Sequence, residues 1–144
     1  MNDQKVTSGT CLCGSVTFKT DTPLDTFGAC HCGMCRKWGG GPFMEVQCKG
    51  TGVEIEGEEN VSVYKSSEWA ERGFCKNCGT HVFYRVAAMN QYHVPLGLFG
   101  DAVSPEFNLQ VFIDKKPDYY SFKQETKNFT EAEIFEMFGA ADPE

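Results

Sequence analysis

Short runs of alternating or apolar residues, separated by turn residues that include many glycines, make up most of this chain. The runs lie at 15–19, 43–48, 53–56, 61–64, 80–85, 92–96 and 109–113. Alternation with a period of two is typical of half-buried antiparallel strands. We therefore predict a mainly β fold. We place the strand at 92–96 at a sheet edge, because Pro95 has no N–H to donate to a neighbouring strand.

The hydrophobic period changes only near the C-terminus. Thr130 and Glu133 have the spacing of a capping box, and Gly139 suits a helix C-cap. We therefore predict a single helix at about 130–138 that packs on the sheet through Ile134, Phe135 and Phe138. A contact in a homodimer is the alternative use of that apolar face.

The length of 144 residues is that of one domain. We expect a single domain over 1–144, with a core at about 8–122. The first residues are polar and lack the apolar centre of a signal peptide, and no run approaches the roughly 20 apolar residues that span a bilayer. These features predict a soluble cytoplasmic protein without a membrane partner.

Cysteine is the residue that carries the candidate chemistry. Seven of the eight cysteines fall in three tight clusters, at 11–13, 30–35 and 75–78. A reducing cytosol disfavours disulfides, and closely spaced cysteine pairs suit zinc. An odd count of seven divides most simply into four ligands and three.

The four-ligand group is predicted from an internal echo. Cys11 and Cys13 are followed by a glycine and a strand, as are Cys75 and Cys78. We call each of these turns with two cysteines a knuckle. Two knuckles facing each other would form a closed, structural zinc site. A glycine after the second cysteine suits a backbone with φ > 0 whose amides point towards sulfur.

The remaining three cysteines, Cys30, Cys32 and Cys35, lie within six consecutive residues and are called the tripod below. Three ligands leave a fourth position on zinc open for water or substrate, which is the arrangement of a catalytic site. A fourth protein ligand would close the site, and the candidates are His31, Cys48, His81 and His93. His31 is expected to point away, and Cys48 is expected in the core.

Glycines 39–41 and Pro42 follow the tripod, and they form either a flexible turn or a close backbone approach to a metal or ligand. Arg36, Lys37 and Arg85 would either bind substrate carboxylates or carry ordinary surface charge. The 20 acidic residues outnumber 13 basic ones, giving a net charge of −7, and no basic stripe occurs. This balance argues against a nucleic-acid partner.

Three segments together resemble the glutathione-dependent formaldehyde-activating enzyme (GFA) family, also called the CENP-V domain family. The segments read C-x-C-G-x-V-x-F from Cys11, C-H-C-x-x-C-R-K from Cys30, and F-C-x-x-C-G-T-x-x-F-Y-R from Phe74. The resemblance runs from Cys11 to about Tyr120.

The resemblance implies a β-tent fold of coiled antiparallel sheets with two Zn²⁺ ions per chain. It implies a carbon–sulfur lyase that interconverts S-hydroxymethylglutathione with glutathione and formaldehyde, so that small thiols and aldehydes are the partners. Carried over by position, the structural zinc would be held by Cys11, Cys13, Cys75 and Cys78, and the catalytic zinc by Cys30, Cys32 and Cys35. No general acid or base is assignable. A non-catalytic zinc module that binds another protein is the alternative.

Overall fold

The structure is a computed structural model that describes residues 5–138. The chain divides into two compact units. Of the described residues, unit 1 comprises those up to Asp25 together with Val46–Ser104, and unit 2 comprises Thr26–Glu45 and those from Pro105 onward. Each unit is described by itself below, and the single domain over 1–144 stays a prediction.

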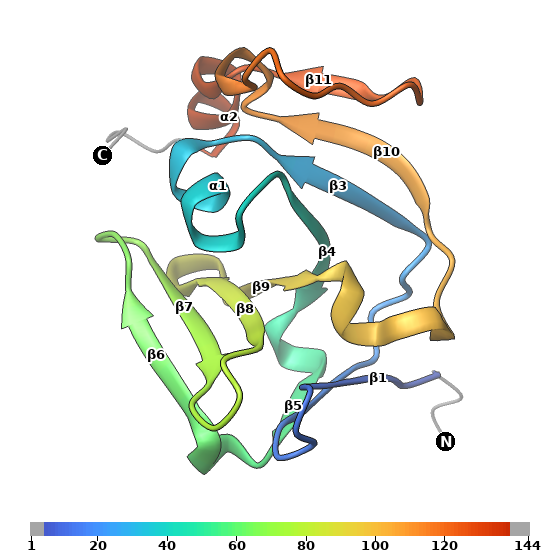
Figure 1. The fold of residues 1–144 in the computed structure, drawn as a ribbon, viewed down its shortest axis with the longest axis vertical. Helices are drawn as coiled ribbons and strands as arrows, with labels where there is room; N and C mark the ends of the chain where they lie inside the picture. The colour runs from blue at the N-terminus through green and yellow to red at the C-terminus, as the bar shows by residue number, and fades with distance from the viewer. Residues whose placement is uncertain (1–4, 139–144) are drawn as a thin grey trace. The chain divides into compact units, whose positions relative to one another are not determined.

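Unit 1 contains two sets of paired strands. The first set is antiparallel and consists, in order, of β1 (Thr7–Thr10), β2 (Thr17–Thr20) and β5 (Val53–Glu56). The second set follows the order β9 (Gln91–Pro95), β8 (His81–Val86), β7 (Ala70–Cys75) and β6 (Val61–Lys65), again with antiparallel neighbours (Figure 1). Unit 1 is thus a β structure in which chain neighbours mostly pair with each other.

Unit 2 is built around β3 (Thr26–Cys30), which pairs with β4 (Phe43–Lys49) on one side and β10 (Glu106–Val111) on the other (Figure 1). The pairing of β3 with β4 is antiparallel, whereas β10 runs parallel both to β3 and to β11 (Lys127–Phe129). Strand β4 begins in unit 2 and continues into unit 1. The parallel pairs are a feature that the expected antiparallel sheets did not include.

Helices are short. The α-helices are α1 (Gly33–Gly39) and α2 (Glu131–Phe138), and the 3₁₀ turns are η1 (Gly50–Gly52), η2 (Glu58–Asn60), η3 (Ala87–Met89), η4 (Leu96–Ala102) and η5 (Ile113–Lys115). Within the described part of the chain, none of them combines the length and apolar character needed to cross a membrane. The mainly β fold with a short C-terminal helix is confirmed.

The capping box of α2 is confirmed by its hydrogen bonds. The Thr130 N–H donates to Glu133 Oε1 at 2.8 Å, and the Glu133 N–H donates to Thr130 Oγ1 at 3.2 Å. Ile134 is buried, and the Phe135 ring lies edge-on to Phe112 at 5.9 Å. The predicted C-cap, residue 139, and the side chain of residue 138 lie outside the described residues.

Each unit has an aromatic core of its own. In unit 1 the fully buried Phe18 ring meets the rings of Tyr92 and Phe99 edge-on, at 5.6 and 6.4 Å. In unit 2 Phe107 stacks on Phe27 at 4.9 Å and meets Phe122 at 5.0 Å. Such pairs combine burial of apolar area with favourable ring geometry, and in unit 2 they hold β3, the strand that carries Cys30, against β10.

Two sequence expectations are wrong. Strand β9 is not at an edge, because it lies between β4 and β8. Pro95 is the last residue of β9, beyond the positions 91–93 that pair with β8, so its missing N–H removes none of those bonds. The helix signal was also expected only at the C-terminus, yet α1 forms directly after Cys32.

Candidate metal centres

Four cysteines of unit 1 come together, as the repeated cysteine motif predicts. Cys11 directly follows β1, Cys13 lies in the turn after it, Cys75 ends β7, and Cys78 lies in the turn that follows β7. The four sulfur atoms all lie within 4.8 Å of one another, and we call this group the four-cysteine cluster. Its Cys13–Cys75 and Cys11–Cys13 sulfur distances are both 3.7 Å. A tetrahedral zinc with Zn–S bonds of about 2.3 Å requires sulfur separations of about 3.8 Å, so the cluster fits this ion.

The two knuckles share one backbone design. The Gly14 N–H donates to the Cys11 carbonyl at 3.1 Å, and the Gly79 N–H donates to the Cys75 carbonyl at 2.7 Å. Both glycines have a positive φ, 84° and 81°, which a residue with a side chain rarely adopts. The predicted positive φ of these glycines is confirmed, whereas their own N–H groups bond to cysteine carbonyls rather than to sulfur.

Hydroxyl groups surround the sulfurs of the four-cysteine cluster. Ser15 Oγ lies 3.0 Å from Cys13 Sγ and 3.3 Å from Cys75 Sγ. Thr80 Oγ1 accepts from the Leu12 N–H at 3.1 Å, which leaves its own proton for the sulfur of Cys78 at 3.2 Å. This hydrogen bond is the largest cause that lowers the pKa of Cys78 to about 5. Hydroxyl donors therefore favour thiolates, the form that binds metal.

Sequence reasoning missed these two hydroxyls, although a signal for them was present. Ser15 and Thr80 occupy the same place in the echo, each directly after a knuckle glycine. A hydroxyl residue at the same position of both cysteine motifs indicates that each hydroxyl contacts a cysteine sulfur.

The tripod forms in unit 2, at the end of β3. Cys30 is the last residue of β3, Cys32 is the N-cap of α1, and Cys35 lies within α1. The Cys35 N–H donates to Cys32 Sγ at 3.3 Å, so the sulfur itself caps the helix. The three sulfurs lie within 4.8 Å of one another.

The chemistry of the tripod suits a cation. Hydrogen bonds to Cys32 and Cys35, together with burial, raise the pKa of Cys30 well above that of a free thiol. Three thiolates at this separation repel one another, so a bound cation is what would let all three ionise together. Within the described part of unit 2, no His, Asp or Glu joins the tripod.

His31 does not complete the tripod. Its Nδ1 lies 2.7 Å from the Tyr120 hydroxyl and its Nε2 lies 2.7 Å from Gln110 Oε1, so both ring nitrogens are engaged. The side chain is fully buried, and burial lowers the pKa of the ring. The expectation that His31 points away is confirmed.

The other candidate ligands lie in unit 1. Cys48 is buried in β4, as predicted for a core residue, while His81 and His93 lie in β8 and β9. None of the three joins the four-cysteine cluster. Burial lowers the pKa of His81 as well, which keeps its ring neutral.

Gly40 ends α1 rather than approaching a neighbour. It is the C-cap with a φ of 86°, and its N–H donates to the Arg36 carbonyl at 2.8 Å. A Cβ placed on any of residues 39–41 would meet no described atom within 4 Å. The glycine run is therefore explained by the turn.

The three basic residues considered as substrate ligands differ in their contacts. Arg36 Nε donates to the His31 carbonyl at 2.9 Å, and Lys37 is exposed. Arg85 donates from Nε and Nη2 to Asn90 Oδ1, at 3.3 and 3.1 Å, and its Nη1 lies 3.6 Å from Glu71 Oε2. Arg36 and Arg85 therefore both have intramolecular roles.

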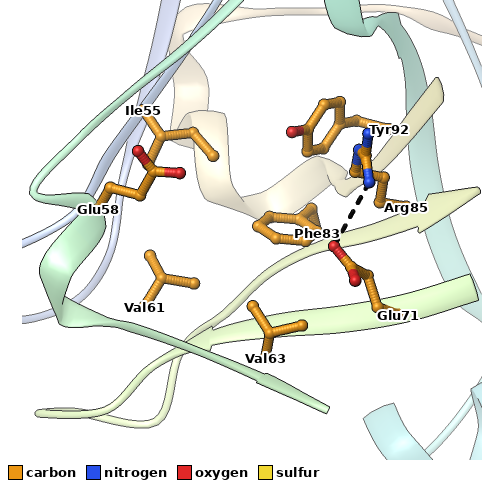
Figure 2. Close-up of a pocket in the computed structure, with 8 residues that line it drawn as sticks. All are labelled: Ile55, Glu58, Val61, Val63, Glu71, Phe83, Arg85 and Tyr92. Atoms are coloured by element: carbon orange, nitrogen blue, oxygen red, sulfur yellow. Dashed lines mark ion pairs between the residues drawn. The ribbon is translucent and has the colours of Figure 1, made fainter. Parts of the chain in front are cut away.

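Unit 1 also has a hollow of about 380 Å³ beside Arg85. Figure 2 shows Glu58 and Arg85 on opposite sides of the Phe83 ring, with the Arg85–Glu71 ion pair drawn. The lining residues are Ile55, Glu58, Val61, Val63, Glu71, Phe83, Arg85 and Tyr92. Because the two carboxylates outnumber the single guanidinium, the hollow suits an apolar or cationic group better than an anion.

Comparison with known proteins finds a family whose profile matches most of the chain. The profile of a family described as "Glutathione-dependent formaldehyde-activating enzyme" matches residues 6–115, a range that holds all seven clustered cysteines. A Schizosaccharomyces pombe protein named an uncharacterized lyase is 39% identical over 127 residues, covering 88% of this chain and 92% of its own length.

A crystal structure of a Rhodobacter sphaeroides protein has a similar fold. The TM-score is 0.58 at 20% sequence identity, and the match covers 70% of this chain and 99% of that one. This likeness supports the mainly β architecture.

Proposed function

This chain belongs to the glutathione-dependent formaldehyde-activating enzyme family, and we propose that it is a carbon–sulfur lyase acting on an adduct of a thiol with a small aldehyde. The lyase name of the 39% identical relative supports this reaction class. The family description favours S-hydroxymethylglutathione, the adduct of glutathione with formaldehyde, as the substrate.

The reaction is a simple exchange of bonds. In the cleavage direction the hydroxyl of the adduct loses its proton and a carbon–oxygen double bond forms. The carbon–sulfur bond breaks, and its electron pair leaves with the sulfur as thiolate. The products are the thiol and the aldehyde, and the reverse reaction joins them, so no oxidant or reductant is needed.

We assign Zn²⁺ to both cysteine groups. An all-sulfur donor set is typical of zinc among the metals common in cells, and the sulfur spacing of the four-cysteine cluster matches the ion. The four-cysteine cluster would hold a structural zinc, because all four positions around the ion would be occupied by protein. The tripod would hold the catalytic zinc.

The tripod is the observation that carries the proposal: three sulfurs converge within 4.8 Å from six consecutive residues, and among the described residues no His, Asp, Glu or further Cys joins them as a candidate ligand. A zinc ion held there would supply an open position at which a thiol is stabilised as thiolate. The side chains of Cys30 and Cys35 are buried in the protein, whereas that of Cys32 is partly exposed to solvent.

His31 is not the group that accepts the proton of the adduct hydroxyl in the cleavage direction. Both of its ring nitrogens are used within the protein, and the side chain has no exposure to solvent. The proton of the adduct hydroxyl must therefore be received elsewhere, and solvent is the simplest acceptor.

Exchange NMR on a mixture of glutathione and formaldehyde tests the proposal. We expect zinc-loaded protein to accelerate interconversion of the adduct with its parts, and the Cys30→Ser variant to show only the rate of metal-free protein. Cys48→Ala is the matched control, because Cys48 lies outside both cysteine groups.

Repeating the measurement with other thiols and aldehydes would define the substrate. If no thiol reacted faster than with metal-free protein, the lyase proposal would fail. The chain would then be better described as a zinc-binding module for a protein partner.

A further inference from the structure

His31 has every polar group bonded within unit 2. Besides its ring contacts, its backbone N–H donates to the Val111 carbonyl at 3.1 Å, and its carbonyl accepts from Arg36 Nε at 2.9 Å. A fully buried residue with four such bonds is fixed in position. Its two chain neighbours, Cys30 and Cys32, are tripod residues, so fixing His31 fixes the backbone between them.

A chain of hydrogen bonds runs from His31 through Gln110 and Thr126 to Asn128. Gln110 Nε2 donates to Thr126 Oγ1 at 2.9 Å, and that hydroxyl donates to Asn128 Oδ1 at 2.6 Å. With the single Thr126 proton directed to Asn128, the Gln110 amide nitrogen faces Thr126 and its oxygen faces His31. A carbonyl oxygen only accepts, and the proton of the His31 ring therefore sits on Nε2.

With the proton on Nε2, the Nδ1 atom of the neutral ring accepts from the Tyr120 hydroxyl. Tyr120 is itself held by Lys116, whose Nζ donates to the Tyr120 carbonyl at 2.5 Å and to the Pro117 carbonyl at 3.1 Å. The ring of Tyr120 also stacks on that of His31 at 5.5 Å. We call this group the His31 network; its members are Tyr120, His31, Gln110, Thr126 and Asn128.

We propose that His31 is a positioning residue for the tripod, held by the His31 network so that the three sulfurs converge before a metal binds. The functional importance of this role rests on the proposed function of the tripod. The network links a local metal motif to β10 and to the segment after η5, both distant in sequence. Substitutions of such supporting residues typically weaken metal binding about 10- to 100-fold.

Cobalt(II) titration of the metal-free protein tests the proposal, with Co²⁺ as the probe and its visible absorption as the readout. Tyr120→Phe removes one hydroxyl and keeps the stacked ring. We expect its second Co²⁺ to bind about 10-fold more weakly while the first binds as in the wild type. Tyr119→Phe is the matched control, because Tyr119 is 81% exposed and lies next in the chain.

A second pair of variants separates positioning from simple destabilisation. Gln110→Leu removes the acceptor for Nε2, whereas Gln110→Glu retains one. We expect Gln110→Leu to weaken the second Co²⁺ and Gln110→Glu to restore most of the affinity. Equal affinity for all variants and the wild type would overturn the proposal, as would equal losses for both Gln110 variants.

Nitrogen-15 NMR of His31 gives a readout that does not depend on metal or activity. We expect the Nε2–H tautomer in the wild-type protein; an Nδ1–H tautomer would contradict the network. These measurements need no substrate. The positioning role can therefore stand if the lyase activity is not found, and it can fail while the activity is confirmed.

Discussion

The two cysteine groups use the same ligand in opposite ways. The four-cysteine cluster joins segments 62 residues apart, as its contact between Cys13 and Cys75 shows. The tripod comes from one strand end and the helix that follows it. A metal in the four-cysteine cluster therefore closes a long loop and contributes to folding, whereas a metal in the tripod adds little chain closure. Because both groups use the same ligand type, the difference lies in how many cysteines each has and how far apart they are in the chain.

Their surroundings differ in the same sense. Hydroxyls from Ser15 and Thr80 contact the sulfurs of the four-cysteine cluster directly. In the tripod the Cys32 sulfur accepts from the Cys35 N–H, and the backbone of His31 between two of the ligands is held by hydrogen bonds to Val111 and Arg36. The four-cysteine cluster is thus stabilised by hydrogen bonds to its sulfur atoms, whereas in the tripod the backbone that carries the ligands is held in place.

The largest effect is expected from Cys78→Ser. Losing one ligand of a closed zinc site removes much of the metal's contribution to folding, so the melting temperature should fall by more than about 10 °C. Thermal unfolding followed by circular dichroism measures this, with Cys48→Ala as the control. A melting temperature within a few degrees of the wild type would contradict the structural role of the four-cysteine cluster.

Cys30→Ser is expected to act on activity instead. It should lose one zinc of two, keep its fold, and lower the lyase rate at least about 100-fold, because the reactive centre is gone. Metal analysis, circular dichroism and exchange NMR give the three readouts. Unfolding as severe as that of Cys78→Ser would show that both sites are structural, and would break the comparison.

Chelation should separate the sites kinetically. A zinc held by three protein ligands leaves an open position for a chelator, so the tripod should release its metal first. We expect a two-step release in which activity is lost in the first step and secondary structure in the second. Simultaneous loss of both metals would argue against an open second site.

Ser15→Ala should have the smallest effect. It removes the hydroxyl that lies near Cys13 Sγ and Cys75 Sγ and that accepts from Asn77 Nδ2 at 3.3 Å. We expect a loss of about 1 kcal/mol in the free energy of unfolding of the zinc-loaded protein, the usual value for one hydrogen bond. Urea denaturation measures it, and an unchanged lyase rate would show that the effect is confined to the four-cysteine cluster.

Most strands could be predicted from the local sequence pattern, and the errors in these predictions have physical causes. The predicted strand at 109–113 begins earlier, as β10 at Glu106, because residues 106 and 107 pair with β3. β3 itself, Thr26–Cys30, has no clear alternation since its last three residues are all buried. Helix α1 has only seven residues, too few for a helical period to stand out in the sequence; its ends are explained by the sulfur cap at Cys32 and the C-cap Gly40.

The sequence alone determined the division of the cysteines, the knuckle glycines and the capping box of α2, because each depends on residues close together in the chain or on a repeated motif. Only the tertiary structure revealed the His31 network and the parallel strands of unit 2. Residues 31, 110 and 120 have no local pattern in common, and their hydrogen bonds exist only once β3, β10 and the segment after η5 have come together.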